Sequence, residues 1–150
     1  MEDKGLIQKQ PLGEILIARK LITIHQLEEA LRLQKRENVF LGEILVKLGY
    51  LEERDIVVAL VMQCNIPYIA IDKYDIDKNV IQLVSSEMAV RDMLVPLDRV
   101  GDILSVVMLN PLDLSIKAEL RRMTNCQVAP FIATKSEIQR AINRWYPKES

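Results

Sequence analysis

The sequence has few of the residues on which catalytic, metal-binding and disulfide-rich proteins depend. Its 150 residues include one histidine and two cysteines, and Cys64 and Cys126 are too far apart for a CxxC motif. This pattern predicts two buried free thiols in a reducing compartment. The five glycines are too scattered for a GxGxxG turn, and neither a GxxxxGK(S/T) phosphate loop nor a GxSxG elbow occurs. The sequence therefore predicts no enzymatic activity, no catalytic residues and no metal ligands.

The chain also lacks an excess of positive charge and a long apolar run. Twenty Lys and Arg residues oppose 21 Asp and Glu residues, and the formal net charge is −1. Phosphate binding relies on clustered basic residues, so a nucleic-acid polymer is not expected as a partner. No run approaches the ~20 apolar residues that cross a bilayer, and the first residues are polar and acidic, unlike a signal peptide. We therefore expect a cytoplasmic chain without a transmembrane segment.

A tandem repeat organises the first half of the chain. Residues 11–34 align without gaps on residues 40–63, at a shift of 29 positions. The five residues of the segment 12–16, Leu-Gly-Glu-Ile-Leu, recur unchanged at 41–45. The pair Ala-Leu at 30–31 recurs at 59–60, and a glutamine ends each copy. Such similarity at a fixed spacing indicates a duplicated structural unit.

Each copy is predicted to form a short helix, a tight turn and a longer helix, because its apolar residues recur at helical spacing. The turn falls at Lys20 in the first copy and at Gly49 in the second, and glycine best tolerates the left-handed conformation that ends a helix. Thr23 and Gln26 have the spacing of a capping box at the start of the longer helix. His25, between them, is expected to be solvated.

Two pairs of equivalent residues admit more than one interpretation. Gly13 and Gly42 lie inside predicted helices, where glycine costs about 1 kcal/mol relative to alanine. A repeated cost suggests a close approach to the backbone, either by another helix or by a flat ligand, with helix packing favoured. Gln34 and Gln63 end apolar stripes with an amide, which either hydrogen-bonds a ligand or caps a carbonyl.

The second half has a mixed α/β pattern. Short apolar runs predict strands at 93–97, 103–108 and 128–132, with a glycine-containing hairpin turn at 98–102. Helices are expected at 76–83, at 86–91 with a cap from Ser85 or Ser86, at about 113–123, and from a capping box at 134–137 onward. The predicted fold class is therefore α+β: a helical tandem-repeat subdomain at 1–64, then a small mixed sheet covered by helices at 65–150.

The repeat resembles a known family. Leu-Gly-x-x-Leu, a glycine turn and a second helix ending in Leu-x-x-Gln form a pattern similar to the tandem motif in N-terminal domains of type II secretion and type IV pilus assembly ATPases. The resemblance continues in order through most of the chain, at Ile-Pro-Tyr 66–68, Val-Pro-Leu 95–97, Gly-Asp 101–102, Asn-Pro-Leu-Asp 110–113 and Ala-Ile-Asn-Arg-Trp-Tyr 141–146. It implies that both subdomains form one such N-terminal domain, either cut from a larger ATPase or free-standing.

The resemblance implies two functions. Domains of this family dock on the cytoplasmic part of an inner-membrane assembly protein, which implies a peripheral location at that membrane and an ATPase partner in cis or in trans. A subset binds cyclic di-GMP as a ligand across the tandem motifs. Carried over by position, the residues that would form that nucleotide cradle are Leu12, Gly13, Leu16, Leu27, Leu31 and Gln34 in the first copy and Leu41, Gly42, Leu45, Ile56, Leu60 and Gln63 in the second.

The sequence departs from the nucleotide-binding pattern at one position in each copy. That pattern usually begins with a basic residue before Leu-Gly, whereas Pro11 and Phe40 stand there in this chain. Two phosphates need compensating donors, and arginine also stacks on guanine. Lys9, Lys35 and Arg36 are the nearby basic residues that would have to substitute. Protein docking is therefore the leading expectation, and cyclic di-GMP binding is the alternative.

Overall fold

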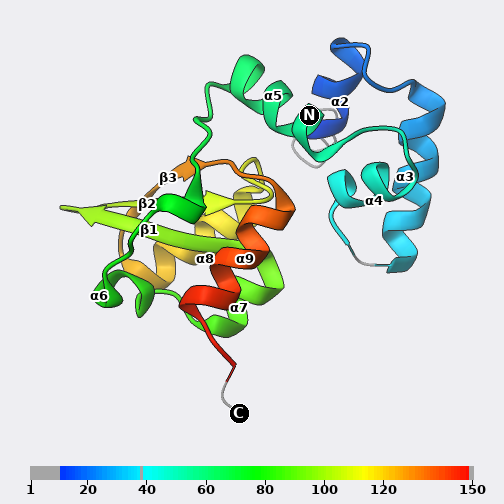
Figure 1. The fold of residues 1–150 in the computed structure, drawn as a ribbon. Coiled ribbons are helices and arrows are strands. Elements are labelled where there is room, and N and C mark those ends of the chain that lie inside the picture. The colour runs from blue at the N-terminus through cyan, green and yellow to red at the C-terminus, as the bar shows by residue number, and fades with distance from the viewer. Residues whose placement is uncertain (1–10, 38, 149–150) are drawn as a thin grey trace. The chain divides into compact units, whose positions relative to one another are not determined.

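The computed structural model describes residues 11–37 and 39–148 (Figure 1). The chain divides into two compact units, one ending at Asn65 and the other beginning at Ile66. Helices build the described part of the first unit, and a three-stranded mixed sheet with surrounding helices builds the second. The predicted α+β class is confirmed.

The first unit contains the two copies of the repeat as two helix pairs. Its elements are α2 (Pro11–Ala18), α3 (Ile24–Glu37), α4 (Leu41–Lys47) and α5 (Glu53–Cys64). Each copy thus has a short helix followed by a longer one, as the apolar spacing predicts. Equivalent positions are buried in both copies: Leu16 and Leu45 are fully buried, and so are Ala30 and Ala59.

The turn inside each copy has the same backbone structure. In the first copy, Lys20 has φ +61° and Leu21 N donates to Leu16 O at 2.9 Å. In the second, Gly49 has φ +82° and Tyr50 N donates to Leu45 O at 3.0 Å. Both patterns are Schellman motifs, in which a left-handed residue lets the next amide satisfy a carbonyl of the last helical turn. The lysine therefore adopts the conformation that the glycine adopts in the other copy.

Each longer helix begins with a side chain that folds back on the backbone. Gln26 Oε1 accepts the Thr23 N–H at 2.9 Å, and Thr23 Oγ1 accepts the Gln26 N–H at 3.2 Å, which confirms the predicted capping box. At the equivalent place in the second copy, Asp55 Oδ2 accepts the N–H of Glu52 at 2.8 Å. These bonds satisfy amides that have no partner inside the helix.

The second unit places its helices around one sheet. Its elements are η1 (Ile71–Lys73), α6 (Lys78–Ile81), α7 (Ser86–Asp92), β1 (Leu94–Val100), β2 (Ile103–Met108), α8 (Leu114–Thr124), β3 (Gln127–Phe131) and α9 (Lys135–Trp145). The strand order is β1-β2-β3, with β1 antiparallel and β3 parallel to β2. Helices α6, α7 and α9 contact β1, and α8 contacts β3 (Figure 1).

The structure corrects several predicted boundaries in this unit. Strand β1 extends to Val100, so the hairpin turn is shorter than predicted and has Gly101 at φ +62°. The helix expected at 76–83 is one turn, Lys78–Ile81, capped by Asp77. Ser85, rather than Ser86, caps α7 by accepting the Met88 N–H at 3.2 Å. The capping box at Thr134 is confirmed.

Hydrogen bonds to backbone carbonyls attach the first and the last residues of this unit to the rest of it. Ile132 N donates to Pro67 O at 2.9 Å and Ile69 N donates to Ile132 O at 3.1 Å, so the start of this unit adds a short bridge beside β3. Near the other end, the hydroxyl of Tyr146 lies 3.0 Å from both Ile81 O and Val84 O, which share its single proton. Burial raises the pKa of this phenol, which keeps it protonated as a donor.

Candidate functional site

The space beside each helical glycine is filled by an apolar side chain from the longer helix of the same copy. A Cβ added at Gly13 would lie 2.8 Å from Leu27 Cδ1, and one added at Gly42 would lie 3.0 Å from Ile56 Cδ1. The longer helix of each copy therefore lays an apolar side chain on the glycine of the shorter one. Leu12 Cδ2 of the first copy also lies 3.6 Å from the Cβ position at Gly42, so the two copies meet there. Of the two interpretations, the geometry supports helix packing.

The apolar residues carried over to the nucleotide cradle belong largely to the core of the first unit. One hydrophobic cluster contains the buried side chains of Leu16, Leu27, Leu41 and Leu45 and the partly buried side chains of Leu12, Leu31 and Ile56. Leu60 is also buried, with 1% of its surface exposed. A ligand could therefore reach only some of the twelve residues carried over to the nucleotide cradle. Its apolar part consists of Leu12, Leu31 and Ile56.

The two glutamines occupy different environments. Gln34 Nε2 donates to the carbonyl of Val39 at 3.1 Å, and this bond joins α3 to the residue before Phe40. Gln63 is exposed in the last turn of α5. The amide of Gln34 thus acts as a carbonyl cap, while the amide of Gln63 faces solvent.

The positions that precede Leu-Gly differ from those expected of a phosphate site. Phe40 is the residue before α4 and is half-buried, without a side-chain capping bond. Pro11 begins α2. Of the basic residues that would have to substitute, Lys35 and Arg36 lie exposed in the last turn of α3, and Lys9 lies outside the described residues. Lys47 forms an ion pair with Glu37 at 3.0 Å.

A tyrosine joins the two copies. The hydroxyl of Tyr50, just after the turn of the second copy, donates to Glu29 Oε1 on α3 of the first. The hydrogen bond to this carboxylate is the main cause of a raised pKa at Tyr50. The first copy has Leu21 at the equivalent position, so the link is asymmetric.

The remaining candidate residues are consistent with structural roles. The side chain of His25 is 91% exposed and lies 3.5 Å from Glu28, as expected for a solvated helix start. Both cysteines are thiols, but only Cys126 is buried; Cys64 is half-buried, which corrects the prediction of two buried thiols. Within residues 11–37 and 39–148, no three His, Cys, Asp or Glu side chains converge to hold a metal ion. No helix in this part of the chain is long and apolar enough to span a membrane.

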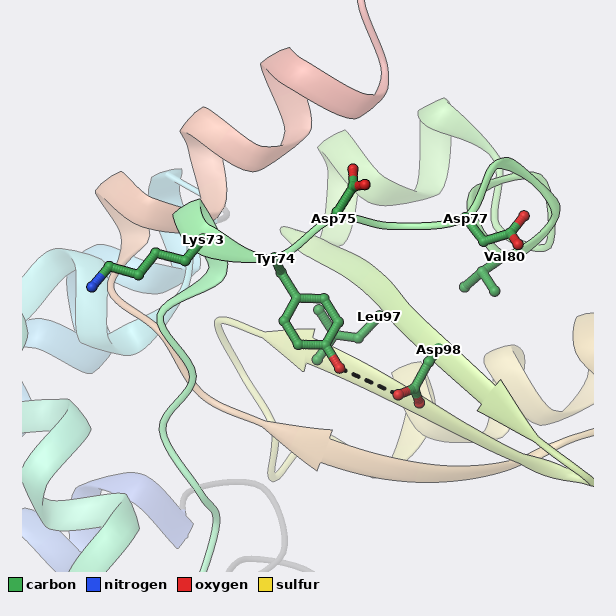
Figure 2. A pocket seen from close by; sticks show the side chains of 7 residues that line it. All are labelled: Lys73, Tyr74, Asp75, Asp77, Val80, Leu97 and Asp98. Atoms are coloured by element: carbon green, nitrogen blue, oxygen red, sulfur yellow. Dashed lines mark hydrogen bonds between the residues drawn. The ribbon is translucent and has the colours of Figure 1, made fainter.

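The second unit contains a surface hollow that sequence reasoning missed (Figure 2). Its volume is about 350 Å³, and its lining is formed by Lys73, Tyr74, Asp75, Asp77, Val80, Leu97 and Asp98. The hydroxyl of Tyr74 donates to Asp98 Oδ2 at 3.3 Å. Burial, and secondarily the Asp98 carboxylate, raises the pKa of Tyr74. The lining comes from two segments, 73–80 and 97–98, which sixteen residues separate in the sequence, so no local motif indicates it.

Comparisons with known proteins place this chain in a family. The family model for the MshEN domain matches residues 64–150, and the chain belongs to the MshEN domain family. The resemblance to N-terminal domains of secretion and pilus assembly ATPases is thereby confirmed. The matched residues cover the α/β unit, whereas the tandem repeat lies before them.

Similar curated proteins are much longer than this chain. It is 31% identical to the type IV pilus assembly ATPase PilB of Myxococcus xanthus over 92% of its own length, and 31% identical to PilB of Thermus thermophilus over 91%. It spans 24% and 16% of those two proteins. It is also 27% identical, over 93% of its length, to bacteriophage adsorption protein B of Escherichia coli K12, of which it spans 18%.

Solved structures share the fold of both units. A structure of MshE with cdg (cyclic di-GMP) matches with a TM-score of 0.70 and 28% identity, over 90% of this chain and 98% of that one. A structure of the N-terminal domain of XpsE matches with a TM-score of 0.74 at 19% identity, over 92% of this chain and 95% of that one. The XpsE match therefore supports the fold alone.

Proposed function

We propose that this chain is a non-catalytic interaction domain that docks a pilus or secretion ATPase on the cytoplasmic part of an inner-membrane assembly protein. The observation that carries the proposal is the similarity to PilB along 92% of the chain, which includes both units. In this proposal the domain works in the cytoplasm, next to the membrane, and joins its ATPase in cis or in trans.

The outward side of α5 supports a docking role. Val58 and Met62 are one helical turn apart and are 49% and 65% exposed, although both are large and apolar. Ile24, at the start of α3, is 60% exposed. Apolar side chains that are left in water at neighbouring positions are typical of protein contact surfaces. Because these side chains are exposed, they can be changed with little effect on folding.

The test is a binding measurement between this chain and the purified cytoplasmic part of the inner-membrane assembly protein of the same system. Met62→Glu should weaken the complex about tenfold, because it places a charge in an apolar contact. Val90→Glu, at an apolar position on α7 that is 57% exposed, is the matched control and should leave affinity unchanged. Absence of any complex with the unchanged chain would overturn the docking function.

A second candidate function is reception of cyclic di-GMP. The observation that favours it is the match to MshE with cdg, which covers 98% of that chain. The half-buried Leu12, Leu31 and Ile56 would contact the bases, with the half-buried Gly42 and the exposed Gln63 as further contacts. Pro11 and Phe40 weaken this candidate because neither supplies a phosphate donor or a guanidinium that stacks on guanine.

Calorimetric titration with cyclic di-GMP separates the two functions, with cyclic di-AMP and GTP as controls. We expect affinity weaker than micromolar for the unchanged chain. The double variant Pro11→Arg, Phe40→Arg should bind cyclic di-GMP at least about tenfold more tightly, since two charge-assisted contacts are added. Micromolar or tighter binding by the unchanged chain would make it a nucleotide receptor.

A further inference from the structure

The hollow in the second unit combines an apolar floor with an acidic rim. Leu97, on β1, is 2% exposed and forms the floor together with the half-buried Val80 of α6. Asp77 and Asp98 stand on the rim, and the ring of Tyr74 lies between the two segments (Figure 2). Such a surface suits a long side chain whose stem is apolar and whose end is cationic.

A β-bulge creates this arrangement. The register of β1 against β2 shifts between Pro96 and Asp98, so Leu97 is an extra residue in the strand. Successive residues of a regular strand point to opposite faces, but a bulge re-aims them. Leu97 and Asp98 therefore both line the hollow despite being adjacent in sequence.

The acidic groups retain capacity to accept further hydrogen bonds. Asp98 receives the Tyr74 hydroxyl at 3.3 Å, and Asp77 receives the Asn79 N–H at 2.8 Å, whereas a carboxylate offers about four acceptor sites. Asp75, 93% exposed, is 4.0 Å from Arg144 and is already partly neutralised. The ammonium of Lys73 extends away from Asp98 (Figure 2). The open end of the hollow is therefore negative.

The geometry points to this hollow as the docking site for an arginine side chain of a partner protein. Its guanidinium stacks on Tyr74 and donates to Asp98, and its methylene stem covers Leu97 and Val80. The carboxylate of Asp77 adds negative charge to the same lining. The inference rests on the proposed docking function and adds that the partner presents an arginine to the second unit. Charge complementarity and the planar ring select arginine over an apolar or acidic side chain.

The first test is an NMR titration of the full chain with N-acetyl-arginine amide and with its neutral isostere, N-acetyl-citrulline amide. The arginine probe should shift the amide signals of Tyr74, Leu97 and Asp98 in a saturable way. The citrulline probe should give shifts several-fold smaller at equal concentration. Equal responses to both probes, or shifts spread over the surface, would overturn the assignment.

The second test uses the assembly-protein complex and the variant Asp98→Asn, which keeps an acceptor for Tyr74. Its affinity should fall about threefold, as for loss of an exposed charge pair, and the loss should shrink at high salt. Asp102→Asn in the hairpin turn removes the same charge outside the hollow and should have no effect. A complex insensitive to Asp98→Asn would refute the arginine site while docking stands. If no complex forms, the docking function is refuted, and the arginine site is then tested by the NMR titration alone.

Discussion

The two copies of the repeat reach the same backbone structure with different residues. Lys20 and Gly49 occupy the same left-handed position, and Gln26 and Asp55 close the same N-terminal turn. Their glycines differ in surroundings: Gly13 is buried beneath Leu27, whereas Gly42 is only half-buried. The two copies thus share their backbone geometry. Their side chains differ wherever another residue can adopt the same conformation or make the same hydrogen bond.

The largest loss of stability is expected when a bulky side chain replaces either helical glycine. Gly13→Leu should lower the free energy of unfolding by about 2–3 kcal/mol, because the methyls of Leu27 can yield to one added carbon but not to four. Gly42→Leu should cost about 1–2 kcal/mol, since that position is partly open. Urea denaturation measures both, with Ala18→Leu at an exposed site of α2 as control. Stability unchanged in both variants would refute the packing interpretation.

Exchanging the turn residues should have opposite effects in the two copies. Lys20→Gly should stabilise the chain by about 1 kcal/mol, because it removes the strain of a left-handed side chain. Gly49→Ala should destabilise it by about 1 kcal/mol for the same reason. Thermal unfolding of both variants beside the unchanged chain checks the signs. A destabilised Lys20→Gly variant would mean that the lysine side chain itself contributes at the turn.

Removing the helix caps should have smaller effects on stability, of similar size in the two copies. Gln26→Ala and Asp55→Ala each remove the acceptor for the first amide of a long helix and should each cost about 0.5–1 kcal/mol. The aspartate should cost more, since its charge also favours the helix N-terminus. Urea midpoints at neutral pH provide the measurement. A negligible cost in one copy alone would show that its cap does not support its helix.

The asymmetric tyrosine link should appear as a pH effect. The pKa of Tyr50 is raised from its ordinary value of 10.0, mainly by its hydrogen bond to Glu29. A raised folded-state pKa contributes stability that is present below pH 10 and is lost as pH rises through the folded-state value. The unchanged chain should therefore exceed Tyr50→Phe in stability at pH 8, and the gap should narrow above pH 10. A constant gap across this range would exclude the ionisation as its cause.

Periodicity and local spacing predicted the helices of both copies, the Thr23 and Thr134 capping boxes and strand β2. These features depend on residues within one or two turns of one another. The second cap was missed because Glu52 and Asp55 are not the residues of the usual signature. The turn at Lys20 was predicted only through its alignment with Gly49.

Features that depend on distant residues could not be read from the sequence. The bulge at Leu97 is set by the pairing of β1 with β2, and the hollow needs that bulge beside the segment around Tyr74. Which apolar residues of the repeat are core and which are reachable depends on packing: Leu16 and Leu12 belong to one motif, yet only Leu12 is partly exposed. The carried-over cradle remains a prediction.

The most direct test of the docking account is the affinity of this chain for the cytoplasmic part of its assembly protein, measured with and without cyclic di-GMP. The account predicts a saturable complex in the absence of nucleotide and the same affinity in its presence. A complex that forms only with cyclic di-GMP, or none under either condition, would contradict it.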